Sequence, residues 1–243
     1  MPKLAIIGYG QMGKLVDELS GKYGFKVVSR IDPQLGTSLS KADLKDAEIA
    51  IEFTEPKSAV ANIKACLKLG IKIVSGTTGW LEDLPQIKQE INANAGSLVY
   101  GSNFSPGMNL FYGIVAAAAE IMNNAADYDV YGYELHHRHK KDSPSGTAKQ
   151  LAAILLDKYK TKDKAVYQCL ERQRADNEIH FGSVRGGEIP GEHRIGFDSE
   201  YDSIELKHTA RNRKGLAAGA LQAAAFLLSR QGCFDFKDIL EEL

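Results

Sequence analysis

The feature that most constrains this 243-residue chain is a glycine-rich turn between an apolar strand and a helix. Residues 4–7 predict a buried strand, and the apolar residues after the turn recur at helical spacing: Met12, Leu15, Val16 and Leu19. Between them stands Gly8-x-Gly10-x-x-Gly13. Because glycine has no Cβ, a pyrophosphate can approach the backbone N–H groups of such a turn closely. The combination predicts a dinucleotide-binding unit, and the alternative is a glycine-rich turn that holds no ligand.

The same alternation of strand and helix continues through the first hundred residues. Further strands are expected at 25–31, 48–53, 71–74 and 97–100, with helices at 57–69 and 81–94. Alternation of this kind predicts a Rossmann-type parallel, doubly wound sheet, hence an α/β fold. In such sheets, ligands bind at the carboxyl ends of the strands.

Several segments at that edge are candidates for cofactor binding. They are the glycine-rich turn, the acid that ends the second strand, and the loops after two later strands: Gly8, Tyr9, Gly10, Gln11, Met12, Gly13, Asp32, Gly76, Thr77, Thr78, Gly101, Ser102, Asn103 and Phe104. An acid about 20 residues beyond the last glycine can accept hydrogen bonds from the adenosine ribose hydroxyls, which is the role expected of Asp32.

The surroundings of Asp32 bear on the choice between NADH and NADPH. The next residue is Pro33, which cannot bind a 2′-phosphate, and a carboxylate without a compensating cation repels that phosphate. We therefore expect a preference for NADH, while Arg30 leaves use of NADPH open.

A second cluster of functional residues lies at 133–148, Tyr-Glu-Leu-His-His-Arg-His-Lys-Lys-Asp-Ser-Pro-Ser-Gly-Thr-Ala. It follows a strand expected at 128–135 and precedes a helix for which Ser145 is a suitable N-cap. A helix N-terminus favours a carboxylate or phosphate, and imidazoles exchange protons near neutral pH. The alternatives are a solvated basic loop and a metal site at His136 and His139, although cationic neighbours and the lack of a nearby cysteine disfavour metal.

The string from Glu134 to Ala148 resembles the signature of the dihydrodipicolinate reductase family. The resemblance implies NAD(P)H-dependent reduction of 4-hydroxy-tetrahydrodipicolinate to tetrahydrodipicolinate, in diaminopimelate and lysine biosynthesis. It implies that His136 and Lys140 are catalytic proton donors and that His137, Gly146 and Thr147 bind the substrate dicarboxylate. The glycine-rich turn and the loops at 76–79 and 101–105 are similar to the cofactor contacts of that family.

The remainder of the chain predicts a second, smaller unit. Strand patterns at 178–184, 193–197 and 203–209 favour an α+β unit with a mixed or antiparallel sheet. We expect a dinucleotide domain formed by 1–106 plus about 212–243, and a substrate domain at 107–211 through which, by resemblance, a homotetramer assembles. The strand histidines His180, His193 and His208 are expected to be structural. Arg185 either assists a substrate carboxylate or forms a salt bridge.

Composition excludes some partners. A net charge of −1 gives no general attraction to nucleic acid or membrane, and the most apolar run, 216–228, is too short to cross a bilayer. Three widely spaced cysteines and the absence of a leader pattern lead us to expect a cytoplasmic protein. Two other functions stay open, namely a different small Rossmann dehydrogenase and a nucleotide-sensing protein without catalysis.

Overall fold

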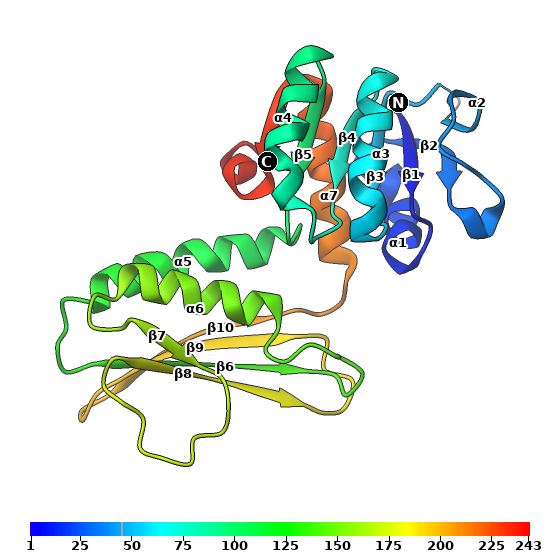
Figure 1. Ribbon diagram of the computed structural model, residues 1–243. Coiled ribbons are helices and arrows are strands. Elements are labelled where there is room, and N and C mark those ends of the chain that lie inside the picture. Colours follow the sequence, from blue (N-terminus) through cyan, green and yellow to red (C-terminus); the bar gives the residue numbers. More distant parts are fainter. Residues whose placement is uncertain (45) are drawn as a thin grey trace. The chain divides into compact units, whose positions relative to one another are not determined.

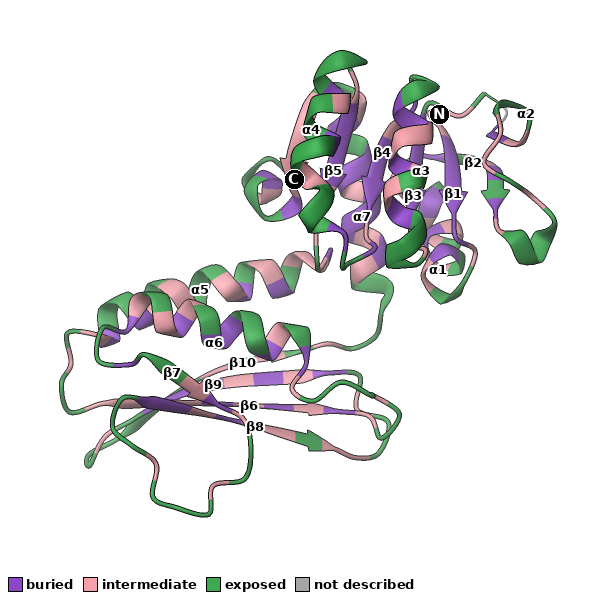
Figure 2. Ribbon diagram, viewed as in Figure 1, coloured by how far each residue is buried: buried purple, intermediate pink, exposed green. Residues whose placement is uncertain are grey.

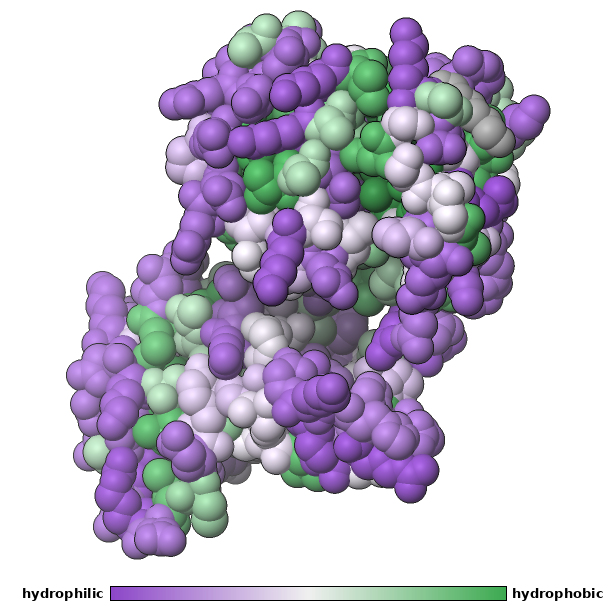
Figure 3. All heavy atoms as spheres, turned by 45° about the vertical axis from the view of Figure 1, so that its right-hand side comes forward, coloured by the Kyte–Doolittle hydropathy of each residue, from purple (hydrophilic) through white to green (hydrophobic). Residues whose placement is uncertain are grey.

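The computed structural model describes residues 1–44 and 46–243, which form two compact units. One unit comprises Met1–Asn109 and Arg213–Leu243, and the other comprises Leu110–Asn212 (Figure 1). Hydrophilic residues predominate on the face of each unit seen in Figure 3, with apolar residues in small groups between them. Among the described residues, no helix has both the length and the hydropathy that a membrane span requires.

The first unit is built on a six-stranded parallel sheet with the strand order β11-β5-β4-β3-β1-β2. The strands are β1 (Lys3–Ile7), β2 (Lys26–Ile31), β3 (Ile49–Glu52), β4 (Lys72–Ser75), β5 (Ser97–Tyr100) and β11 (Gly232–Asp235). The α-helices of this unit are α1 (Gln11–Ser20), α2 (Lys41–Leu44), α3 (Pro56–Lys68), α4 (Leu84–Ala93), α7 (Lys214–Leu228) and the first residues of α5 (Pro106–Met122).

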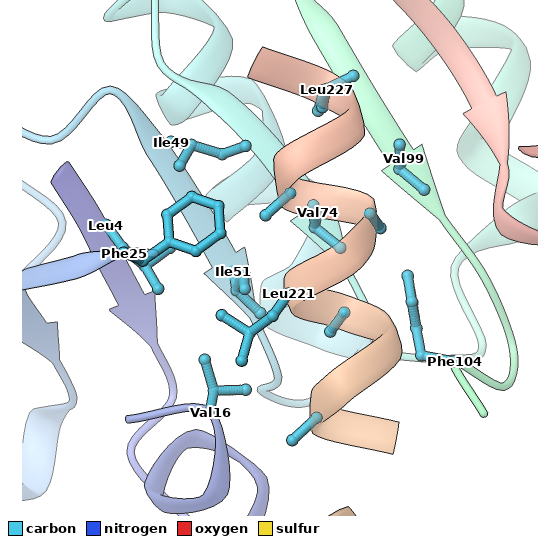
Figure 4. Close-up of a cluster of buried hydrophobic side chains, with 14 of the residues drawn as sticks. Leu4, Val16, Phe25, Ile49, Ile51, Val74, Val99, Phe104, Leu221 and Leu227 are labelled. Carbon is cyan, nitrogen blue, oxygen red and sulfur yellow. The ribbon is translucent and has the colours of Figure 1, made fainter. Parts of the chain in front are cut away.

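Two apolar clusters cover the two faces of this sheet. Ala-rich α7 packs on one face, where Leu221 and Leu227 lie against strand residues such as Ile51 and Val74 (Figure 4). Small residues allow this approach, because a Cβ on Gly219 would lie 1.8 Å from the backbone oxygen of Phe104. The opposite face packs against α3 and α4. Figure 2 shows the resulting burial of the central strands and α7.

The second unit is a five-stranded mixed sheet with the order β10-β9-β6-β8-β7. Its strands are β6 (Asp129–His136), β7 (Lys164–Val166), β8 (Glu178–Arg185), β9 (Glu192–Asp198) and β10 (Ser203–Thr209), and its helices are the rest of α5 and α6 (Gly146–Lys158). Strand β6 runs parallel to β8 and antiparallel to β9. The predicted fold class is therefore confirmed, although the short strands β7 and β11 are additions that the sequence patterns did not indicate.

The buried face of strand β6 is apolar at the start of the strand and polar at its end. Its residues alternate strictly in burial, so that Val130, Gly132, Glu134 and His136 all lie on the covered face. The first two belong to the packed core, since a Cβ on Gly132 would lie 2.5 Å from the ring of Phe181. The last two place a carboxyl and an imidazole on the same buried face.

Candidate active site

The turn between β1 and α1 has the geometry that phosphate binding requires. Gly8 has φ +88°, and a Cβ there would lie 2.1 Å from the backbone oxygen of Phe53. A Cβ on Gly13 would lie equally close to the backbone oxygen of Gly8. Helix α1 has Gly10 as its N-cap, without a capping side chain, so its first N–H groups are available to an anion.

Two cavities of the first unit contain many of the predicted cofactor residues. A cavity of about 740 Å³ is lined by Gly8, Gly10 and Asp32 among others. A second, of about 430 Å³, is lined by Gly10, Gln11, Met12, Gly76, Thr77 and Thr78. A smaller hollow of about 30 Å³ brings Gly101 and Ser102 next to Thr77 and Thr78. The turn and the later loops thus share the carboxyl edge of one sheet.

The other predicted cofactor residues are placed differently. Phe104 is buried in the core, so only its main chain can face a ligand. The side-chain oxygen of Asn103 accepts a hydrogen bond from the backbone N–H of Ser105 at 2.8 Å and shapes its own loop. Gly13 supports the turn by close packing, and the hydroxyl of Tyr9 donates to Asp17 at 2.5 Å.

Asp32 lines the larger cavity, and its carboxylate is held by two backbone N–H groups. One of its oxygens accepts a hydrogen bond from the N–H of Tyr9 at 2.8 Å, and the other accepts from the N–H of Gln34 at 2.9 Å. These donors hold the carboxylate at the end of β2, in the position expected of a ribose-binding acid.

Arg30 is paired with another acid. Its Nε and Nη2 lie 2.7 and 2.8 Å from the two oxygens of Asp17, and its guanidinium stacks over the ring of Tyr9. Although partial burial raises the pKa of Asp17, the hydrogen bonds from Arg30 and Tyr9 lower it below its ordinary value. Arg30, which the sequence analysis considered for binding a 2′-phosphate, is therefore already paired with Asp17.

Two residues of this edge were missed by the sequence analysis. Arg213 lines the second cavity and donates to the side-chain oxygen of Gln11; the basic run Arg211–Lys214 just before an Ala-rich helix was the available indication. Glu52, which ends β3, is fully buried and accepts from the N–H of Thr54 at 2.9 Å and the hydroxyls of Ser75 and Thr77 at 2.7 and 2.8 Å. The hydroxyl of Thr54 also contacts it.

In the second unit, the predicted helix start is confirmed. Ser145 is the N-cap of α6, and its Oγ accepts a hydrogen bond from the N–H of Ala148 at 3.1 Å. Gly146 and Thr147 form the first turn, whose N–H groups have no partner within the helix. Gly146 is exposed, and the Thr147 hydroxyl interacts with the phenol of Tyr112. This helix mouth suits a carboxylate.

Behind the helix mouth lies a buried polar core centred on Glu134. Its Oε1 accepts from Nη2 of Arg185 at 2.7 Å and from the N–H of Ser145 at 3.0 Å. Its Oε2 pairs with Nδ1 of His136. Burial raises the pKa of Glu134, but these three donors and the Ser183 hydroxyl lower it well below the ordinary value of a glutamate. Of the two roles considered for Arg185, the structure shows the salt bridge.

His193 joins this core from β9. It is the cross-strand partner of Glu134, and its ring lies 5.2 Å from that of His136. Its Nε2 lies 3.3 Å from the Oγ of Ser145. Burial, followed by the proximity of His136, lowers the pKa of His193 to about 4, so that this ring is neutral at pH 7. Sequence reasoning treated His193 as an isolated strand residue, because only the register of β6 with β9 brings it to the site.

The basic residues of the loop are less buried than this core. Nζ of Lys140 lies 2.7 Å from Asp142, and half-buried His137 is next to His136 in the chain. Arg138 and His139 are exposed and both lie 3.5 Å from Glu188. The cluster combines groups that can exchange protons with a helix N-terminus that can bind a carboxylate.

These side chains are poorly suited to bind a metal ion. Within the described part of the chain, Glu134, His136 and His193 are the candidate ligands whose atoms lie within 4.8 Å of one another. However, the interactions just described engage both oxygens of Glu134, and the charged guanidinium of Arg185 opposes a cation. The arrangement suits proton transfer better than metal binding.

Comparison with known protein families agrees with this architecture. Residues 2–104 match the family model described as dihydrodipicolinate reductase, N-terminus, and residues 107–240 match its C-terminus. A 4-hydroxy-tetrahydrodipicolinate reductase from Christiangramia forsetii is 39% identical over 242 residues, covering 99% of this chain and 98% of that protein. One from Ralstonia nicotianae is 33% identical, covering 98% of this chain and 99% of that protein.

Solved structures show the same fold at lower identity. The dipicolinate-bound dihydrodipicolinate reductase from Paenisporosarcina superposes with a TM-score of 0.78 at 22% identity, over 98% of this chain and 99% of that chain. An amine dehydrogenase from Mycobacterium smegmatis superposes with a TM-score of 0.60 at 14% identity, over 98% and 95%. From the two family models and the curated relatives, the chain belongs to the dihydrodipicolinate reductase family.

Proposed function

We propose that this protein reduces 4-hydroxy-tetrahydrodipicolinate to tetrahydrodipicolinate, with one NAD(P)H and one proton consumed and one water released. The curated relatives carry the name of this activity, and the Paenisporosarcina reductase was solved with a planar dicarboxylate bound. The feature of this chain that best supports the proposal is the link from His136 through Glu134 to Ser145, the N-cap of α6, with Lys140 in the loop between β6 and α6. NAD(P)H supplies the hydride when bound, and its dinucleotide fits the glycine turn and the carboxyl edge of the parallel sheet.

Each residue of the cluster has a separate task in this proposal. The N–H groups of Gly146 and Thr147, with the Thr147 hydroxyl, hold one substrate carboxylate, and His137 contacts the substrate. His136 donates the proton that the reduced ring requires, and Lys140 is a second donor. Proton transfer of this kind contributes roughly 10² to 10⁴ in rate.

Substitutions at the two proton donors test this assignment. We expect His136→Gln and Lys140→Ala each to lower kcat by roughly 10²- to 10⁴-fold, with the Kd for NADH unchanged. Lys141→Ala is the matched control, because this exposed neighbour has no assigned role. The assay follows nicotinamide absorbance with freshly generated substrate. An unchanged kcat in both variants would remove these residues from the chemistry, and turnover only with other amino or hydroxy acids would replace the substrate.

NADH is the proposed preferred cofactor. Asp32 faces the larger cavity, Pro33 offers no cation, and Arg30 is held by Asp17. The test is the ratio of kcat/KM for the two dinucleotides, and a higher value with NADPH would overturn the preference.

Domain roles, assembly and location complete the proposal. Residues 1–106 plus about 212–243 bind the dinucleotide, while 107–211 bind the substrate and assemble a homotetramer through the second sheet. Support comes from the edge strand β10, most of whose residues are exposed, so that its free edge is open to pairing. Free Cys66, Cys169 and Cys233 fit a reducing cytoplasm. Light scattering at several concentrations checks the assembly, and a monomer throughout would exclude the tetramer.

A further inference from the structure

We infer that Glu134 is a positioning residue that holds the proton of neutral His136 on Nδ1, so that Nε2 exchanges protons with the substrate. The inference rests on the proposed function for the identity of the substrate alone. The arrangement of donors and acceptors around the imidazole carries the rest, and all of it lies within the second unit.

The two oxygens of Glu134 are divided between different partners. Oε1 accepts two hydrogen bonds, from Arg185 and from the N–H of Ser145. Oε2 pairs with Nδ1 of His136, and the Ser183 hydroxyl also interacts with this carboxylate. A carboxylate with so low a pKa can only accept, so the nitrogen facing it must carry the proton.

The other edge of the His136 ring faces Gly191, which has no side chain. A Cβ on Gly191 would lie 3.1 Å from Nε2 of His136, so that a larger residue there would crowd this nitrogen, and Nε2 is not among the fully buried atoms that lack a hydrogen-bond partner. Nearby His193 is neutral, and its Nε2 faces the Oγ of Ser145. It therefore adds no positive charge beside His136 when that ring becomes an imidazolium.

The same carboxylate joins the proton donor to the carboxylate-binding helix. Because Oε1 holds the N–H of the N-cap residue Ser145, the helix mouth and the imidazole share one buried anchor. When Nε2 releases its proton to the substrate, the Nδ1 proton stays on the ring. The ring then returns to the charged form by taking a proton at Nε2, and Glu134 stabilises that form.

This arrangement makes a specific prediction for Glu134→Gln. A glutamine has a single acceptor oxygen, and both Arg185 and the N–H of Ser145 require an acceptor at Oε1. The amide NH₂ must then occupy the place of Oε2 and donate to Nδ1. We expect the tautomer of His136 to reverse, with its proton on Nε2, and kcat to fall by roughly 10²- to 10⁴-fold while the Kd for NADH is unchanged.

Nitrogen NMR of the imidazole tests the inference without reference to turnover. Full-length protein with ¹⁵N-labelled histidine is measured over a series of rising pH values until the His136 signals show a ring with a single proton, and these signals are identified by their loss in His136→Gln. The wild type should show a protonated Nδ1 and an unprotonated Nε2, and Glu134→Gln should show the reverse. Glu188→Gln, which removes an exposed carboxylate near Arg138, should change neither the tautomer nor kcat.

The possible results separate this inference from the proposed function. A wild-type ring protonated on Nε2 would overturn the role of Glu134 even if the enzyme reduces its substrate normally, and it requires no variant to fold. A reversed tautomer in Glu134→Gln with kcat unchanged would also overturn it. Conversely, a protonated Nδ1 in a wild type that lacks reductase activity would reject the proposed function and leave the positioning by Glu134 standing.

Discussion

Each unit of this protein buries one glutamate at its functional edge, and the two differ in the groups that surround them. Glu52 ends β3 in the first unit, and Glu134 lies near the end of β6 in the second; both are 0% exposed. Glu52 receives its hydrogen bonds from hydroxyls and one backbone N–H. Glu134 receives them from a guanidinium, an imidazole and one backbone N–H.

The chemistry of the donors decides which glutamate depends on its charge. A hydroxyl can rotate and accept a hydrogen bond instead of donating one, whereas a guanidinium can only donate. The surroundings of Glu52 can therefore adapt to a neutral side chain of the same shape, and those of Glu134 cannot. The first glutamate connects backbone segments of the proposed cofactor edge, while the second balances charge beside His136, the proposed proton donor.

The largest expected difference comes from removing one donor at each site. Arg185→Met leaves Glu134 buried without its counter-ion, and we expect a loss of about 3–5 kcal/mol in the free energy of unfolding. Ser75→Ala removes one neutral donor from Glu52 and should cost about 1–2 kcal/mol. Urea denaturation followed by circular dichroism measures both. Equal losses would show that the two carboxylates are held in the same way.

The second expected difference is in the response of stability to acid. All six histidines lie in the second unit. The folded-state pKa of His193, about 4, lies below its unfolded value near 6.5, so between these pH values the unfolded chain binds more protons. Stability should therefore fall by up to about 3 kcal/mol as the pH drops from 6.5 to 4. The lowered pKa of Glu134 contributes stability above its unfolded value, about 4.5, and that stability is lost only at lower pH.

The variant His193→Gln isolates this contribution. It keeps a polar side chain at the position but has no group that titrates in this range, so the loss between pH 6.5 and 4 should become smaller by the same amount. His180→Gln, on β8 of the same sheet and with an exposed polar contact, is the matched control. Parallel pH curves for wild type and His193→Gln would contradict a buried neutral imidazole.

The fold was largely predictable from the sequence because its signals are local. The glycine turn, the alternation of strand and helix, and the cap at Ser145 each depend on a few neighbouring residues. Strands β7 and β11 were not predicted, since three or four residues at a sheet edge give too short a pattern to distinguish from a loop.

The site was predictable only in part, for a related reason. His136 and Lys140 stand in one conspicuous string, but their supporting residues come from other strands. Strand register places Glu134 opposite His193 and His136 beside Arg185. A pattern along one strand cannot reveal such partners, so the sequence analysis treated His193 as an isolated strand residue and Glu52 only as part of the strand at 48–53.

Replacing the charged Glu52 by a neutral side chain of the same shape tests the comparison further. Glu52→Gln should cost no more than about 1 kcal/mol, because the hydroxyls of Ser75 and Thr77 can accept from the new amide. The KM for NADH should change less than about threefold, a free-energy change under about 1 kcal/mol. Glu52→Leu is the paired variant, as it keeps bulk and removes every acceptor. A loss with Gln as large as that with Leu would mean that the charge of Glu52, and not its geometry, holds the loops.

The smallest expected effect belongs to a carboxylate–guanidinium pair that is much more exposed than the pair of Glu134 and Arg185. Side chains of Arg30 and Asp17 are 42% and 17% exposed, so Asp17→Asn should cost at most about 1 kcal/mol of stability. Freed from Asp17, Arg30 becomes available to a 2′-phosphate near Asp32. We expect the ratio of kcat/KM for NADPH over NADH to rise roughly two- to fivefold, which corresponds to about 0.5–1 kcal/mol. Glu18→Gln, at an exposed ion pair of the same helix, is the control. An unchanged ratio in Asp17→Asn would assign the cofactor preference to Asp32 and Pro33 alone.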